Sequence, residues 1–150
     1  MDLTTRQRNR LMASFTPDDP AVCWPWTAAL DRGGYGKFRF SDGGTKRALP
    51  AHRVVYRVLV GPIPEGMHLD HLCRNRQCVN PDHLEPVTPA ENTRRGTAAR
   101  THCGKGHEFT PENTGYAAKT ARGKTYQNIR FCRACARDAQ LRNRERRRAA

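Results

Sequence analysis

The sequence lacks any long apolar run, and it has few of the aromatic residues from which a large core is built. Phe, Trp and Tyr make up 7% of the 150 residues, and the mean hydropathy is −0.84. Without ~18 consecutive apolar residues no membrane contact through a spanning helix is expected. The polar N-terminus also lacks the apolar centre of a signal peptide. We therefore expect one small domain, with at most a small appendage, in the cytoplasm or associated with the nucleoid.

Lysine is also scarce, because only five of the 27 basic residues are Lys and the others are Arg. The planar guanidinium of Arg is suited to bidentate contact with phosphate. Residues 94–150 hold 15 Lys and Arg against 4 Asp and Glu, whereas residues 1–93 hold 12 against 10. A basic tail on a nearly neutral body favours a polyanionic partner, and nucleic acid rather than a membrane surface.

Six cysteines are present, and in a reducing compartment they are better interpreted as metal ligands than as disulfides. Cys73 and Cys78 are close enough in sequence to bind one ion, and His83 follows at a compatible distance. Structural zinc takes four ligands, and Cys23 is the only other cysteine of this half. We therefore assign Cys23, Cys73, Cys78 and His83 to one zinc, which would replace part of the core that the chain lacks.

The pattern of apolar and turn residues predicts a mixed α and β arrangement. Thr88-Pro89-Ala90-Glu91 has the residues of a capping box with Pro at the first helical position, so a helix should begin there and carry Asn92 in its first turn. Asp42-Gly43-Gly44 indicates a hairpin turn. The expected elements, in chain order, are a helix over 4–14, strands over 35–40 and 45–48, a helix over 52–60, strands over 67–71 and 84–87, and the helix from residue 88.

The segment around His71 resembles the His-Cys box homing endonucleases, a branch of the ββα-metal nucleases that also contain the HNH enzymes. The residues that carry the resemblance are His71, Cys73, Asn75, Cys78, Asn80-Pro81, His83-Leu84 and Asn92. The resemblance implies that His71 is the general base, that Asn92 binds a catalytic Mg²⁺, and that Cys73, Cys78 and His83 hold zinc, with Cys23 as the more distant zinc cysteine. The Asp70-His71 pair is similar to that of HNH enzymes, in which the Asp is a second ligand of the catalytic metal.

The resemblance implies a fold and an activity. The fold would be α+β, a small zinc-stabilised ββα-metal core preceded by a β-hairpin and helix. The activity would be hydrolysis of DNA, with Mg²⁺ or another divalent ion, to 5′-phosphate and 3′-hydroxyl ends, in a bacterial or phage-infected cell. A noncatalytic zinc protein that binds nucleic acid is the alternative.

Three side chains in this half have more than one interpretation. Arg53 could bind the scissile phosphate or could simply be a solvated Arg. Asn80 could fix the loop and orient His71, or it could simply form an Asn-Pro turn. His83 could bind the catalytic metal instead of zinc, although Cys73 and Cys78 would then lack partners.

The second half of the chain contains another Cys and His group. Cys103 and His107 precede the pair Cys132 and Cys135, a spacing typical of a zinc ribbon. His102 is the rival ligand, but it is adjacent to Cys103, which makes joint chelation awkward. We therefore expect a second zinc site here, which gives two zinc ions per chain. A pair of strands is expected within residues 115–129, between the two pairs of ligands.

The expected domains are a nuclease over 1–95, a linker over 96–101 and a zinc module over 102–150 that ends in an Arg-rich helix or tail. A disordered, solvated tail is the alternative for the end of the chain, and a homodimer is possible. The Arg residues expected to contact DNA phosphates are Arg94, Arg95, Arg137, Arg142, Arg144, Arg146, Arg147 and Arg148.

Overall fold

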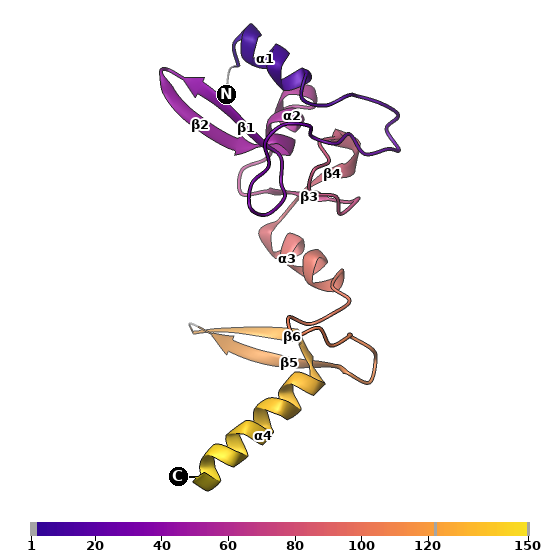
Figure 1. Cartoon of the computed structure of the whole chain (residues 1–150), viewed down its shortest axis with the longest axis vertical. Coiled ribbons are helices and arrows are strands. Elements are labelled where there is room, and N and C mark those ends of the chain that lie inside the picture. The colour runs from indigo at the N-terminus through magenta and orange to yellow at the C-terminus, as the bar shows by residue number, and fades with distance from the viewer. Residues whose placement is uncertain (1–2, 122, 150) are drawn as a thin grey trace. The chain divides into compact units, whose positions relative to one another are not determined.

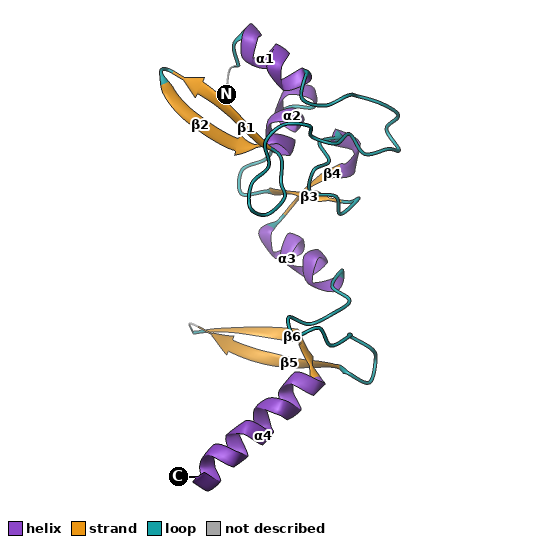
Figure 2. Cartoon of the chain, in the orientation of Figure 1, coloured by secondary structure: helices purple, strands orange, loops and turns teal. Residues whose placement is uncertain are grey.

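The computed structural model describes residues 3–121 and 123–149. The chain divides into two compact units, Met1–Arg94 and Arg95–Ala150, and each is described by itself (Figure 1). The elements of the first unit are α1 (Thr5–Met12), β1 (Lys37–Asp42), β2 (Thr45–Pro50), α2 (Ala51–Leu59), β3 (His68–His71), η1 (Pro81–His83), β4 (Leu84–Val87) and the start of α3 (Pro89–Ala98). The expected α+β class is confirmed, and the strands of the described residues form antiparallel pairs (Figure 2).

The N-terminal part of the first unit builds its apolar core. Helix α1 begins with a capping box in which Thr4 and Gln7 exchange hydrogen bonds, and Leu11 on this helix is fully buried. The main buried cluster joins α1, strand β1, α2, the segment between α1 and β1, and the β3–β4 loop; it consists of Leu11, Phe15, Trp26, Phe38, Phe40, Ala51, Val54, Val55 and Val79.

Gly36 permits the start of β1 to pack closely against Trp26 and the start of α2. A Cβ at this position would lie 2.7 Å from the Trp26 ring and 2.9 Å from the Cβ of Ala51. Only a residue without a side chain therefore permits β1 to begin so close to the start of α2. The close approach fixes the N-terminal end of α2, where His52 and Arg53 lie.

The second part of the unit follows the predicted order of strand, loop, strand and helix. Strands β3 and β4 pair antiparallel, with His71 opposite Leu84 and Asp70 opposite Glu85. The amide of Glu91 donates to the Thr88 hydroxyl at 3.2 Å, which is the predicted capping contact. Helix α3 continues to Ala98, so the expected linker over 96–101 begins inside a helix, and the domain bounds stay a prediction.

The second unit contains β5 (Thr114–Ala121), β6 (Lys124–Cys132) and α4 (Arg133–Ala149). The two strands form a hairpin whose register shifts between Ala117 and Lys119, and Asn128 on the bulged strand has φ of 54°. Among the described residues from 95 onward, only Gly115 and Cys132 are buried. No helix of the described chain is long and apolar enough to cross a bilayer.

Candidate active site and metal centres

The loop between β3 and β4 brings together the first expected group of zinc ligands. The ligand atoms of Cys23, Cys73, Cys78 and His83 all lie within 4.8 Å of one another. The His83 Nδ1 is 3.5 Å from the Cys23 Sγ and 3.6 Å from the Cys78 Sγ. With zinc bonds of about 2.3 Å to sulfur and about 2.0–2.1 Å to nitrogen, a tetrahedron places such atoms roughly 3.5–3.6 Å apart. The donor set and its spacing therefore fit one zinc.

Backbone bonds join this loop to the N-terminal segment that supplies Cys23. The Trp26 amide donates to the Gln77 carbonyl at 2.8 Å, and the Val79 amide donates to the Trp24 carbonyl at 2.9 Å. Cys78 itself is fully buried, and burial raises the pKa of its thiol to about 12. A thiolate is therefore unfavourable at this position unless a cation is bound.

Asn80 is fully buried and engaged with backbone on both sides of its amide. Its Nδ2 donates to the carbonyls of Pro20 and Val22, at 3.0 and 2.7 Å, and its Oδ1 accepts from the Asp82 amide at 3.0 Å. These contacts connect the loop before Cys23 to the turn that carries His83. Asn80 thus supports the arrangement of ligands rather than presenting an atom to a substrate.

His71 ends β3 and is 6% exposed. Its Nε2 lies 3.0 Å from the Cys78 carbonyl, and because a carbonyl only accepts, this bond places the proton on Nε2 and leaves Nδ1 as the basic nitrogen. Burial lowers the pKa of His71 and Arg74 adds to the lowering, whereas the Cys78 carbonyl and Asp70 oppose it. The imidazole is therefore neutral near neutral pH.

His52 on α2 is a residue of this site to which the sequence assigned no role, because a lone helix histidine is more often a core residue than a ligand. Its ring packs edge-on against the His71 ring with centroids 4.7 Å apart, and Tyr35 lies 5.7 Å from His52 and 5.8 Å from His71. The buried Nδ1 of His52 has no hydrogen-bond partner among the described residues. Burial, followed by the charges of His71 and Arg53, lowers the pKa of His52 to about 3. The neutral His52 ring therefore packs against the His71 ring.

Asp70 is 5% exposed and lies next to His71 in β3. Neighbouring residues of a strand point to opposite faces, so the two side chains leave the end of β3 on opposite sides. The Asp70 Oδ1 accepts from the Arg74 Nη1 at 2.9 Å, and Arg74 adopts a left-handed backbone with φ of 58°. An Arg side chain thus contacts the carboxylate at which a cation is expected.

Asn92 lies in the first turn of α3, as the capping signal predicts, and contacts a second residue that the sequence did not single out. Its Nδ2 is 3.3 Å from the Nδ1 of His68. His68 and Asp70 share one face of β3, since alternate residues of a strand do. Asn92 therefore packs over the face that carries Asp70, and a donating Nδ2 leaves its Oδ1 as a possible ligand atom.

The arginines of the first unit differ in their surroundings. Arg94 forms a bidentate ion pair with Glu91, with both N–O distances 2.7 Å, and Arg95 is half-buried. Arg53 is half-buried, and burial followed by the charge of Arg57 lowers its pKa. Within the described chain no carboxylate lies within ion-pairing distance of Arg53.

The second group of expected ligands also comes together. The ligand atoms of Cys103, His107, Cys132 and Cys135 lie within 4.8 Å of one another, with a separation of 3.7 Å between the sulfurs of Cys103 and Cys135. The Cys135 amide donates to the Cys132 sulfur and, as the first cause, lowers the pKa of Cys132 to about 6. The arrangement again fits a tetrahedral zinc.

The surrounding backbone accounts for the shape of this second cluster. Gly106 has φ of 83° and donates to the Cys103 carbonyl at 2.9 Å, which forms the tight turn between the first two ligands. Asn113 donates to the Cys132 sulfur at 3.4 Å and accepts from the Ala134 amide at 2.9 Å. The rival ligand His102 is exposed and contacts Thr101 instead.

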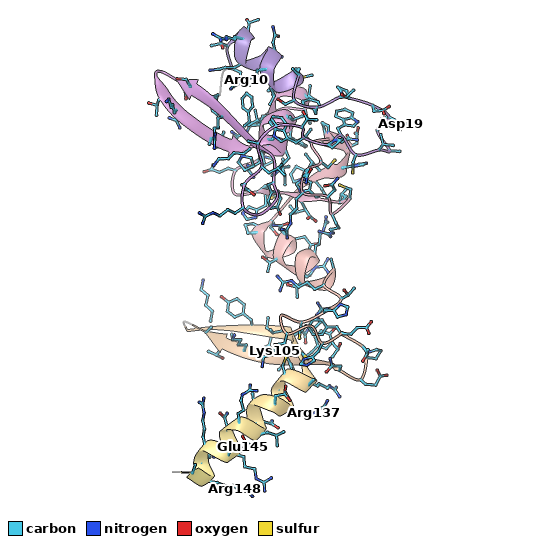
Figure 3. The ribbon with its side chains drawn as sticks, viewed as in Figure 1. Arg10, Asp19, Lys105, Arg137, Glu145 and Arg148 are labelled. Atoms are coloured by element: carbon cyan, nitrogen blue, oxygen red, sulfur yellow. The ribbon has the colours of Figure 1, made fainter. Side chains whose placement is uncertain are left out.

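The remaining expected phosphate contacts lie on α4. Arg137, Arg142, Arg144, Arg146, Arg147 and Arg148 are all exposed on this helix. Figure 3 shows Arg137 in its N-terminal half and Arg148 near its C-terminal end. The segment after Cys135 is therefore a helix, the first of the two expected forms.

The chain is similar to known phage proteins. A family model described as HNH endonuclease matches residues 49–94. Protein 7.7 of Escherichia phage T7 is 30% identical over 92 residues, which are 61% of this chain and 67% of that protein. Protein 2.8 of the same phage is 35% identical over 92 residues, 61% of this chain and 60% of that protein. The gene 5.3 protein of Enterobacteria phage T3 is 44% identical over 56 residues, 35% of this chain and 55% of that protein.

The coverage of these matches is partial. The chain spans less than two thirds of protein 2.8 and of the gene 5.3 protein. The solved structure of the HNH homing endonuclease I-HmuI aligns with 75% of this chain and 65% of that chain, at a TM-score of 0.42 and 16% identity, which is too distant to carry residue roles. The family match spans α2 to α3 and includes Asp70, His71 and Asn92, so this chain belongs to the HNH endonuclease family.

Proposed function

We propose that the protein is a divalent-metal-dependent DNA endonuclease that leaves 5′-phosphate and 3′-hydroxyl ends. The observation that carries this proposal is the end of β3, where His71 leaves the strand on one side and Asp70 on the other, with Asn92 packed over the Asp70 face. A phosphodiester that lies across this strand end would meet a base on one side and oxygen ligands on the other. That is the arrangement that an in-line displacement requires.

His71 is the proposed general base. The Cys78 carbonyl holds its Nε2 proton at 3.0 Å, and the His52 ring restricts its rotation. Its Nδ1 then accepts a proton from the attacking water. A general base typically contributes about 10²–10⁴ to the rate.

Asp70 and Asn92 are the proposed ligands of the catalytic cation. Carboxylate and amide oxygens suit Mg²⁺. When bound, the cation would stabilise the negative charge that develops on the phosphate and on the leaving oxygen. His68 is the proposed positioning residue, because its contact engages the Asn92 Nδ2 and leaves the amide oxygen to ligate the cation. Arg74 would release Asp70 and become available to the phosphate.

The two Cys and His clusters are proposed as structural zinc sites. The first holds the loop whose Cys78 carbonyl orients His71, so the zinc would act on catalysis through the position of the base. The second organises the unit that carries the Arg-rich helix, which we propose as a sequence-independent phosphate contact together with Arg53, Arg94 and Arg95.

The test is nicking of supercoiled plasmid by zinc-loaded protein with Mg²⁺. Wild type should nick, and His71→Ala should lose activity by at least about 100-fold. His102→Ala is the matched control, because this exposed histidine belongs to neither cluster, and it should keep full activity. A chain that binds DNA but does not nick with any divalent ion would be a noncatalytic zinc protein.

A further inference from the structure

A hollow in the second unit lies between the β5–β6 hairpin and α4, and no metal ligand lines it. Its volume is about 340 Å³, and it is largely open to solvent. The residues that line it are Gly115, Tyr116, Phe131, Arg133, Ala136, Arg137 and Gln140. It therefore has two aromatic residues of the hairpin along one side and cations and an amide of the helix along the other.

The hairpin side of the hollow presents aromatic surface to solvent. The Tyr116 side chain is 65% exposed and Phe131 is 37% exposed. Gly115 is paired with Phe131 across the hairpin, and a Cβ at Gly115 would lie 2.4 Å from the Phe131 ring. The Phe131 ring thus lies close to the backbone of Gly115, in space that a side chain at position 115 would enter.

On the helix side, a row of mostly basic side chains runs from the hollow along one face of α4, and we call it the Arg stripe. Arg133, Arg137 and Gln140 are spaced four and three residues apart, and this periodicity extends through Arg144 to Arg148 on the same face of α4. The two carboxylates of the helix, Asp138 and Glu145, fall on another face. The stripe is therefore uniformly positive where it leaves the hollow.

We propose that this hollow binds an unpaired base of single-stranded DNA, with the adjoining phosphates along the Arg stripe. Aromatic rings beside a basic track are the means by which proteins hold single strands, because every base has a face that stacks. In a duplex these faces are already stacked inside the helix, so the same surface would offer phosphate contacts only. The Gln140 amide can hydrogen bond to the base edge. This proposal rests on the proposed function only in taking DNA as the ligand.

The test uses full-length, zinc-loaded protein with His71→Ala as the background, so that binding is measured without cleavage. Fluorescence anisotropy compares a labelled DNA strand of roughly 12 nucleotides with the duplex of the same sequence. Tyr116→Leu should weaken single-strand binding about 5- to 100-fold and change duplex binding less than about twofold. Phe131→Leu, which keeps an apolar side chain, should act in the same direction.

A matched control and a charge variant separate loss of base stacking from loss of folding and from loss of phosphate contacts. Tyr126→Leu removes a 49% exposed tyrosine of the same hairpin that does not line the hollow, and it should leave both affinities unchanged. Arg137→Gln should reduce the salt dependence of single-strand binding by about one phosphate contact, whereas Tyr116→Leu should leave that slope unchanged. Zinc content measured for each variant shows that the unit is folded.

The proposal is overturned if Tyr116→Leu and Tyr126→Leu have equal effects, or if Tyr116→Leu weakens duplex binding as much as single-strand binding. Tighter binding of an RNA strand of the same sequence would also overturn the assignment to DNA. Absence of plasmid nicking by wild type counts against the nuclease alone, because binding in the His71→Ala background does not depend on it.

Discussion

The two Cys and His clusters share one ligand set but lie in different surroundings. The first lies in a unit with a buried apolar cluster that includes Leu11, Trp26 and Val54. The second lies in a unit where, among the residues that the structure describes, only Gly115 and Cys132 are buried. In the first unit a zinc would brace a loop of a folded domain, whereas in the second it would take the place of a core.

The two units differ in this way because the first can gain folding free energy from apolar burial, whereas the second must gain it mainly from zinc binding. Burial of an apolar side chain contributes about 1.5–3 kcal/mol, and the first unit has many such side chains. A structural zinc contributes roughly 10–16 kcal/mol of apparent binding free energy in small zinc peptides, and that energy is folding energy when no site exists before folding. The second unit has little other source.

The largest expected effect is loss of the second unit on removal of zinc. A strong chelator should unfold β5, β6 and α4, since the described residues of this unit form no buried apolar cluster that could hold them together. The first unit should keep its core, and two-dimensional NMR can follow both, because Trp24 and Trp26 are the only tryptophans of the chain and belong to the first unit. Their indole signals should stay dispersed while the backbone amide signals of the β5–β6 hairpin collapse.

Single ligand substitutions sharpen the same comparison. Cys132→Ser should reproduce the chelator's effect on the second unit, and Cys23→Ser, its counterpart in the first, should disturb only the loop around His83. Collapse of the tryptophan signals in Cys23→Ser would show that both units depend on zinc alike, and the comparison would then fail.

A substitution in the apolar core should destabilise the first unit and leave the second unit unchanged, the opposite of the effect expected from loss of zinc. Leu11 is 0% exposed, and Leu11→Ala should destabilise the first unit by about 2–5 kcal/mol through lost burial and a cavity. Urea unfolding followed by tryptophan fluorescence measures this change. Val60→Ala in the same unit, where the side chain is 58% exposed, is the control and should change stability by less than about 0.5 kcal/mol.

A smaller effect is expected from the acid titration of His52. Its pKa is lowered to about 3, first by burial and then by the charges of His71 and Arg53, with Asp31 opposing. Between about pH 6.5, its ordinary value, and pH 3 the unfolded chain binds a proton that the folded chain does not. Stability from neutral His52 is thus complete above pH 6.5 and falls as the pH decreases, by at most about 1.4 kcal/mol per unit.

The matching measurement compares urea unfolding of wild type and His52→Gln at several pH values. Zinc ligands also titrate in this range, but they do so in both proteins, so the difference between the two curves reports His52. The wild-type curve should be steeper below pH 6.5. Parallel curves would mean that His52 is protonated as easily in the folded chain as in the unfolded one.

Local signals predicted the parts of this fold that local chemistry decides. The Thr88 to Glu91 capping residues placed the start of α3 and the register of Asn92, and Cys and His spacing placed both groups of ligands. The turn at Asp42 to Gly44 placed the β1–β2 hairpin.

Contacts between distant segments were not predictable in this way. The pairing of His68 with Asn92 depends on how α3 packs over β3, and the edge-on packing of His52 against His71 depends on the close approach that Gly36 permits. Asn80 is another example, because its partners near Pro20 and Val22 lie about sixty residues away. No spacing rule contains this information, since these partners meet only through tertiary packing.

The most direct test of the central claim is Mg²⁺-dependent nicking by protein whose zinc content is measured in the same sample. The account predicts about two zinc ions per chain in wild type, His71→Ala and Asp70→Asn alike, with nicking only in wild type and only after Mg²⁺ is added. Nicking that persists in both variants with zinc retained would contradict it, because the chemistry would then lie outside the end of β3.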